Sequence, residues 1–234
     1  MSEDRFGRFF RDIQTRPSPI DDQGLPRNDS HRNELKTSHS LLQQLNKLPI
    51  DPREVFVVHG RNSIARTAVF DFLRAIELRP LGWDEVVIRT HTGSPFVLEV
   101  LERGFEIAQA VVVILTPDEE VTLCPALCQA PDDAKPRYQP RPNVLFEAGM
   151  AFMRDRERTI LLHFGSTDVL SDLSGVHMLS ATRDPLENMK LRVQFAERLE
   201  KAGCPVKKTG TEWITAGEFH CAFLQDVPDG KVAS

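Results

Sequence analysis

At the centre of the chain stands Val111-Val112-Val113-Ile114-Leu115-Thr116-Pro117-Asp118, five aliphatic residues followed by a polar turn. A continuous aliphatic run of this length is typical of a parallel strand that is covered on both faces. Similar runs occur at residues 55–58 and 159–164. Together the three runs predict a parallel sheet buried between layers of helices.

Outward from these runs, apolar residues recur at the spacing of amphipathic helices. They predict helices over residues 63–78, 95–110 and 185–201, and a helix that contains Glu147 and ends near residue 154. Ser94 before Pro95 is typical of a helix start, and Gly203 of a helix end. Shorter apolar runs predict strands at residues 86–88 and 176–179. A turn at 171–175 separates the strand at 176–179 from the strand at 159–164. This alternation predicts an α/β fold, a doubly wound parallel sheet of about five strands.

The regular pattern is flanked and interrupted by segments of another kind. Residues 1–50 are polar and read as an arm with a short helix over 30–47, followed by a linker at 49–52. We expect one domain over 51–205 and a tail over 206–234, part of which packs through Trp213, Phe219 and Phe223. Residues 116–140 form a proline-rich insertion without periodicity, and a loop of this length is uncommon unless it is functional or disordered.

Composition narrows the class of protein. The chain has 234 residues and a net charge of −5, which argues against a broad nucleic-acid interface. No apolar run is long enough to span a membrane, and the first residues lack the layout of a signal peptide, so we expect a cytoplasmic protein. Cys124 and Cys128 have no second pair nearby, so no metal site is expected.

One carboxylate stands apart from the other charges. Glu147 lies in Arg141-Pro142-Asn143-Val144-Leu145-Phe146-Glu147-Ala148-Gly149, a largely apolar helix start that follows the strand at 111–115. Open α/β sheets hold their ligands at the carboxyl ends of their strands, so Glu147 is a candidate for chemistry. A second interpretation is an acid of the first helical turn, stabilised by the helix dipole. A capping box does not fit, because with Asn143 as N-cap the third helical position is Phe146.

Three ordered segments carry a resemblance to a known family. They are residues 55–62, residues 113–118 and, most specifically, residues 141–149, with a weaker fourth match at 171–176. Residues 55–203 resemble a bacterial TIR-like nucleotide-binding domain, of the subgroup found in antiphage effectors triggered by cyclic nucleotides. The sequence departs from the family pattern at two places. At residues 93–96 it has Gly-Ser-Pro-Phe, where relatives usually have Gly, then Arg or Lys, then Thr. The second departure is the insertion at 119–140.

The resemblance implies a flavodoxin-like sheet and the hydrolysis of NAD⁺ between nicotinamide and ribose, with Glu147 as the essential acid. NAD⁺ would be substrate, with no further cofactor. It also implies self-association that completes the site, and an activating partner protein or a cyclic-nucleotide-dependent sensor. Two alternatives to hydrolysis remain open, an enzyme that produces a cyclic or conjugated ADP-ribose signal and a non-catalytic adaptor.

Candidate substrate-binding residues lie in the segments that follow the predicted strands. They are His59, Gly60, Arg61, Thr92, Gly93, Ser94, Asp118, Arg141 and Asn143. Each also has a structural interpretation. Gly60 would permit a tight turn, Asp118 would end a strand, Asn143 would cap a helix, and Arg141 would be a solvated loop charge. The loop with Thr92 would gate the site and aid assembly, or only cap the next helix.

Overall fold

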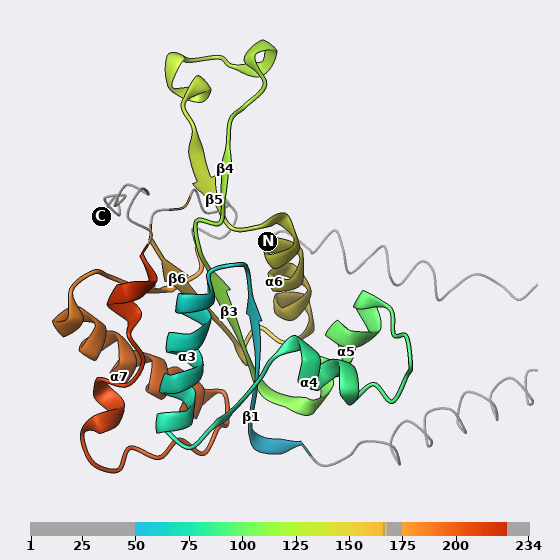
Figure 1. Ribbon diagram of the computed structural model, residues 1–234, viewed down its shortest axis with the longest axis vertical. Coiled ribbons are helices and arrows are strands. Elements are labelled where there is room, and N and C mark those ends of the chain that lie inside the picture. Colours follow the sequence, from blue (N-terminus) through green and yellow to red (C-terminus); the bar gives the residue numbers. More distant parts are fainter. Residues whose placement is uncertain (1–49, 166, 168–174, 224–234) are drawn as a thin grey trace, which may run out of the picture. The chain divides into compact units, whose positions relative to one another are not determined.

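The computed structural model describes residues 50–165, 167 and 175–223 (Figure 1). A five-stranded parallel sheet has the order β2-β1-β3-β6-β7. Its strands are β1 (Asp51–His59), β2 (Arg79–Leu81), β3 (Ala108–Leu115), β6 (Thr159–Phe164) and β7 (Leu179–Ala181). With its strands counted in chain order, this is the flavodoxin-like arrangement, so the predicted fold class is confirmed.

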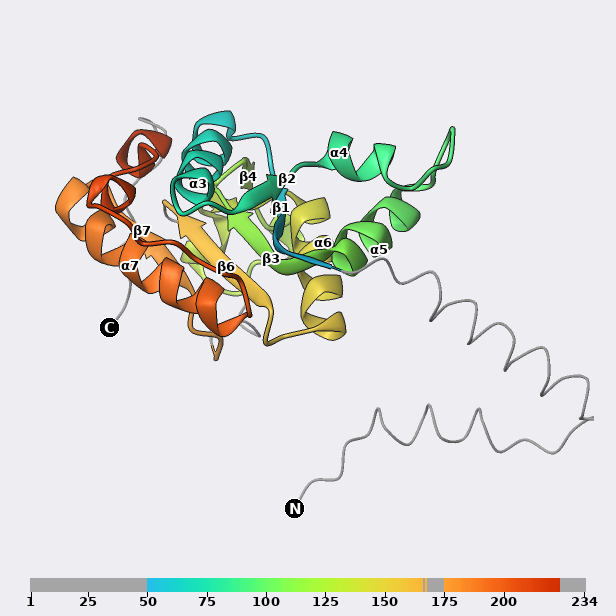
Figure 2. The same ribbon diagram turned by 90° about the horizontal axis from the view of Figure 1, so that it is seen from below.

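Helices cover both faces of the sheet (Figure 2). On one face lie α3 (Ser63–Ala75) and α7 (Pro185–Lys201), and on the other lie α4 (Trp83–Ile88), α5 (Val97–Ile107) and α6 (Pro142–Arg154). The alternation of strand side chains explains both layers. Val55 and Val57 of β1 join the α3–α7 cluster, whereas Phe56 and Val58 join the α4–α6 cluster.

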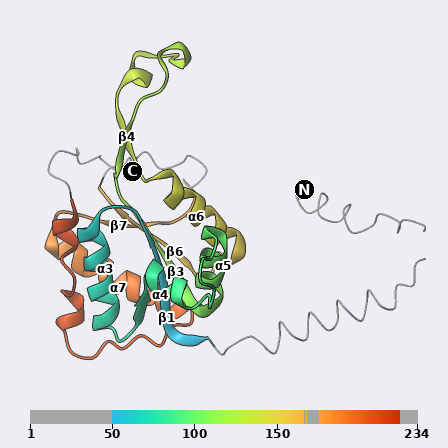
Figure 3. The same ribbon diagram turned by 45° about the vertical axis from the view of Figure 1, so that its right-hand side comes forward.

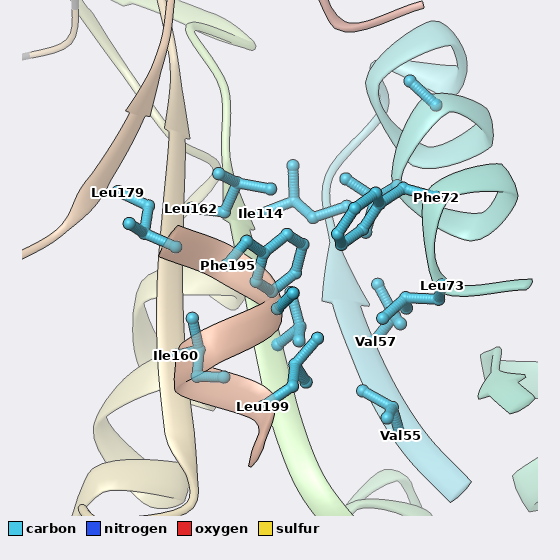
Figure 4. Packing of buried hydrophobic residues seen from close by; sticks show 14 of the residues in the cluster. Val55, Val57, Phe72, Leu73, Ile114, Ile160, Leu162, Leu179, Phe195 and Leu199 are labelled. Atoms are coloured by element: carbon cyan, nitrogen blue, oxygen red, sulfur yellow. The ribbon is translucent and has the colours of Figure 1, made fainter. Parts of the chain in front are cut away.

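The α3–α7 layer is packed by aromatic rings (Figure 4). Phe72 of α3 stacks on Phe195 of α7 with ring centroids 5.0 Å apart, above Ile114 and Leu162 of the central strands. Both phenylalanines are fully buried, and each contributes about 2–3 kcal/mol by leaving water. This packing fixes the carboxyl ends of β1, β3 and β6 along one edge.

The second strand was predicted at the wrong place. Residues 86–88 end helix α4, and the strand beside β1 is Arg79–Leu81. The reason is local, because the Glu85 side chain accepts a hydrogen bond at 3.0 Å from the Gly82 N–H and so starts a helix at Trp83. Val86 is buried in the observed helix and would also be buried in a strand, so a three-residue apolar run could not distinguish these two structures.

Other boundaries shift by a few residues. β1 begins at Asp51, inside the expected linker, and β7 spans 179–181 instead of 176–179. Ser94 does not cap a helix. The helix begins at Val97, where Glu99 accepts from the Phe96 N–H at 3.0 Å. By contrast β6 and α7 have the predicted bounds, α6 ends at Arg154 as predicted, and Gly203 follows the end of α7 with a φ of +91°.

The insertion forms an ordered projection instead of an irregular loop. Antiparallel strands β4 (Glu119–Val121) and β5 (Arg137–Gln139) enclose two 3₁₀ turns, η1 (Pro125–Leu127) and η2 (Pro131–Ala134). The hairpin extends from the carboxyl edge of the large sheet (Figures 1 and 3). Its two ends lead directly to Asp118 and Arg141, so it is continuous with the candidate site.

Residues 206–223 pack against α3 and α7. Trp213, Phe219 and Ala222 are buried in the α3–α7 cluster, as part of η4 (Glu212–Ile214) and η5 (Phe219–Ala222). Arg192 of α7 is 3% exposed, donates to the carbonyls of Ala216 (2.7 Å) and Gly217, and lies 4.4 Å over the Phe219 ring. The expected packing of this segment is thereby confirmed, while the boundary at 205 stays a prediction. The predicted arm, its helix over 30–47 and the turn at 171–174 lie outside the described residues.

Candidate functional site

The candidate site lies where β1 and β3 end. The loop after β1 meets the turn after β3, and α6 begins at the same edge, beside the base of the hairpin (Figure 3). α6 packs on β1 and β3 from the face opposite α3. These contacts bring together segments that the sequence separates by more than fifty residues.

Asp118 ties the two strand ends together. Its carboxylate accepts from the Arg61 N–H at 2.7 Å and from the Thr116 hydroxyl at 2.8 Å. The Gly60 backbone passes so close that a Cβ there would overlap the Asp118 carboxylate. Gly60 is therefore required by this close approach, and not by the left-handed turn conformation that would favour glycine. Asp118 has a structural role in this arrangement.

Glu147 lies in the second turn of α6. Arg141 is the N-cap and Pro142 the first helical residue, so Glu147 is the sixth residue of the helix. The interpretation as a first-turn acid is therefore wrong, and so is Asn143 as the N-cap. Asn143 is an exposed second helical residue. At this depth the helix dipole no longer explains a glutamate.

The surroundings of Glu147 disfavour its charge. Val144, Ala148 and Ala151 form the buried stripe of α6, and Glu147, three residues after Val144, lies beside it, half-buried. Among the described residues, no hydrogen bond or ion pair reaches its carboxyl group. Burial raises its pKa from the ordinary 4.5 to about 6, although the positive charge of Arg141 acts in the opposite direction. A shifted, unpaired acid at the ligand edge of an α/β sheet is a candidate functional group.

Arg141 joins the helix to the hairpin. Its Nε lies 3.4 Å from Oε1 of Glu119, and both side chains are more than a third exposed. Such an ion pair contributes little to stability, so the guanidinium can turn to an anionic ligand at small cost. Arg141 is thus a partly exposed charge that pairs with Glu119, and its role toward a phosphate stays a prediction.

His59 does not share a face with Glu147. It is the last residue of β1, two positions after Val57, so its side chain lies on the α3 side of the sheet, whereas α6 covers the other side. There it lines a cleft with residues of α3 and α4. The structure therefore separates this predicted site residue from the candidate acid.

The loop between α4 and α5 stands apart from the carboxyl edge (Figures 1 and 2). Thr92, Gly93 and Ser94 are all exposed, and the Thr92 N–H and hydroxyl both donate to Thr90. Sequence reasoning placed these residues at the ligand. In the described structure they lie in a projecting loop.

Two contributors were missed by sequence reasoning. Thr116, 1% exposed, holds Asp118, and Glu119 holds Arg141 across the hairpin base. Thr116 follows the last apolar residue of the central strand, a position that could have suggested it. Glu119 pairs with a residue 22 positions away, and no local pattern records that contact.

The described residues contain no group of three or more His, Cys, Asp or Glu side chains placed to hold a metal ion. They also contain no helix that is long and apolar enough to cross a bilayer. The candidate site is thus built from an acid, an arginine and loop backbone.

The fold and this half-buried acid define a flavodoxin-like α/β domain of the TIR class. The family described as CAP12/Pycsar effector protein, TIR domain, matches residues 54–183, more than half of the chain. The chain belongs to this family of antiphage effector TIR domains. Among curated proteins, no match was found.

Proposed function

We propose that the chain is an NAD⁺ glycohydrolase of bacterial antiphage defence, acting in the cytoplasm. The single observation that supports this activity is Glu147, a half-buried carboxyl group without a partner among the described residues, at the carboxyl edge of the sheet. A TIR effector family is consistent with this chemistry.

The reaction needs one carboxylate. When the bond from ribose C1′ to the nicotinamide nitrogen breaks, its electron pair stays with nicotinamide, which leaves as a neutral molecule. Positive charge develops on the ribose, as in glycoside cleavage. The Glu147 carboxylate would stabilise this charge, and its low exposure strengthens the interaction. Water then adds to C1′ and releases a proton, giving ADP-ribose.

Arg141 and the loop after β1 would bind the diphosphate. Within the described residues Arg141 is held by one partly exposed ion pair, with Glu119, so it can exchange that carboxylate for a phosphate. Arg61 offers an exposed guanidinium at the start of α3. Asp118 would keep this loop in place through the Arg61 N–H.

Self-association is the second part of the proposal. Ile88, Phe96 and Val97 are 64–76% exposed around the loop between α4 and α5, and Phe146 of α6 is 65% exposed. Large apolar side chains gathered on neighbouring elements favour contact with another protein. A second copy, brought in by a partner protein or a cyclic-nucleotide-dependent sensor, would complete the site.

The experiment is nicotinamide release from NAD⁺ by the purified chain at low and high protein concentration. We expect release that rises more than proportionally with concentration and falls at least about a hundredfold in Glu147→Gln. The matched control is Glu157→Gln, at an exposed glutamate outside the site. Release that persists in Glu147→Gln would contradict the proposal. Analysis of the ribose product separates hydrolysis from cyclisation, and an adaptor would retain its partner in Glu147→Gln.

A further inference from the structure

A cleft of about 450 Å³ lies between the outer side of α3 and the start of α4. This volume is within the range of small-molecule sites. Its walls carry His59 at the end of β1, Arg66 and Phe70 on α3, and Trp83 and Asp84 on α4. No residue of α6 lines it, so it is separate from the surroundings of Glu147.

The turn after β2 packs against α3 at this cleft. A Cβ on Gly82 would lie 3.7 Å from the Phe70 ring, which is an ordinary contact distance, and 2.9 Å from Oε2 of Glu85, whose side chain would have to shift. The Glu85 carboxylate is already bound to the Gly82 N–H. The walls are thereby held in place by α3 and the turn after β2.

The charged groups of the two walls differ in sign. Arg74 is engaged by Asp71 at 3.3 Å and lies over the Phe70 ring. The Arg66 guanidinium has no hydrogen bond or ion pair within the described part of the chain, and the same holds for the Asp84 carboxylate on the facing wall. A purely anionic ligand would be repelled by Asp84, and a purely cationic one by Arg66. The cleft suits a ligand with a negative group at one end and hydrogen-bond donors at the other.

Aromatic and imidazole groups refine this description. Trp83 is half-buried and offers a ring on which a planar heterocycle can stack. The His59 Nδ1 lies 2.9 Å from the Gly60 carbonyl oxygen. Because a carbonyl oxygen can only accept, the Nδ1–H donates this hydrogen bond, and Nε2 is left for a ligand. A phosphate suits Arg66, and an exocyclic amino group suits the Asp84 carboxylate.

We propose that this cleft binds a nucleoside phosphate whose base carries an amino group, such as adenine or cytosine. Arg66 binds the phosphate, Trp83 stacks on the base, and Asp84 accepts from the amino group. Two sources supply this chemistry, a free nucleotide or the adenosine diphosphate half of a dinucleotide. The proposal concerns binding and does not depend on cleavage of NAD⁺.

Tryptophan fluorescence provides a direct test. The chain has two tryptophans, and Trp213 is 6% exposed in the core, so a ligand in the cleft acts on the emission of Trp83. The full-length chain is titrated with AMP, CMP, IMP and ADP-ribose, and NAD⁺ is added to Glu147→Gln so that no turnover intervenes. We expect saturable quenching by AMP, lost in Trp83→Phe, with IMP binding more weakly because it lacks the amino group.

Substitutions then assign the contacts. Arg66→Ala should weaken AMP about tenfold or more, while Arg156→Ala, at an exposed arginine outside the cleft, should leave it unchanged. Asp84→Asn should remove the preference for AMP over IMP. If ADP-ribose and NAD⁺ bind but AMP does not, and if their binding depends on Arg66, the ligand of the cleft is the dinucleotide. Absence of saturable quenching by every ligand, or equal weakening by Arg156→Ala, would overturn the proposal.

Discussion

Glu147 titrates in a range where its charge can be tested. Burial raises its pKa to about 6, and the proposed reaction needs its carboxylate form. Nicotinamide release should therefore be constant above about pH 7, half-maximal near pH 6, and fall about tenfold per pH unit below that. The measurement is kcat/KM from pH 4.5 to 8. A profile that is flat through pH 6 would argue against a role for the ionised acid.

The same shift predicts a stability effect of defined sign. Because the folded-state pKa exceeds the ordinary 4.5, the folded chain binds more protons than the unfolded chain between pH 4.5 and 6. The contribution of Glu147 to stability is thus lost as the pH rises through this window. Glu147→Gln should raise the free energy of unfolding at pH 7.5 by about 1 kcal/mol, after allowance for solvent screening.

Urea unfolding of both variants at pH 7.5 and pH 4 measures this effect. The difference between the variants should shrink at pH 4, where Glu147 is protonated in the folded chain. An equal difference at both values would show that packing, and not charge, is responsible. A stabilising substitution that removes activity is expected of a group kept for function.

At the scale of the element, α6 contains a glycine that its own geometry does not require. Gly149 lies inside the helix, and a Cβ there would meet nothing within 4 Å. Gly149→Ala should therefore raise the free energy of unfolding by about 0.5–1 kcal/mol. If a substrate or second copy occupies this open space, nicotinamide release should fall although the protein becomes more stable.

Gly93→Ala is the matched control for this prediction. Gly93 lies in the loop before α5, and a Cβ there would also meet nothing within 4 Å. Outside a helix the substitution gains no helix propensity, so its effect on stability should be small. Thermal unfolding and release assays on both variants provide the comparison. A destabilised Gly149→Ala would mean that α6 is packed more closely than the structure describes.

At the scale of the whole molecule, the core extends beyond the strand-and-helix repeat. Trp213, Phe219 and Ala222 cover α3 and α7, and Arg192 binds the chain at Ala216 and Gly217. A chain that ends at residue 205 would expose this apolar surface and remove the two carbonyl partners of Arg192. We expect this loss to be comparable to the roughly 5–15 kcal/mol by which native domains are stable.

Two truncations test this extension. A chain that ends at residue 205 should be insoluble or lack a cooperative thermal transition. A chain that ends at residue 223 keeps every described contact and should unfold within about 3 °C of the full chain. Equal folding of both would place the domain boundary at 205, as predicted from the sequence.

Local sequence patterns predicted much of the secondary structure of this protein. The runs at 111–115 and 159–164 predicted strands, and the spacing of apolar residues predicted α6 and α7, because period and side-chain type are recorded in neighbouring residues. That Glu147 lies in the helix after the central strand was also clear from the order of these segments along the chain. The strand predicted at 86–88 was wrong. Three apolar residues are too few to show a periodicity, and the hydrogen bond from the Gly82 N–H to the Glu85 side chain starts a helix there.

Other features were decided only by tertiary structure. Arg61 and Asp118 meet across 57 residues, and that contact, together with the close approach of Gly60, changes the role of all three. The side of the sheet that His59 faces, the depth of Glu147 in α6 and its raised pKa also depend on which elements pack together. The sequence determined the central strands, the long helices and their order, since these follow from local patterns, but not β2 or the hairpin of β4 and β5. The meeting of distant segments, and hence the chemistry of the site, required the folded chain.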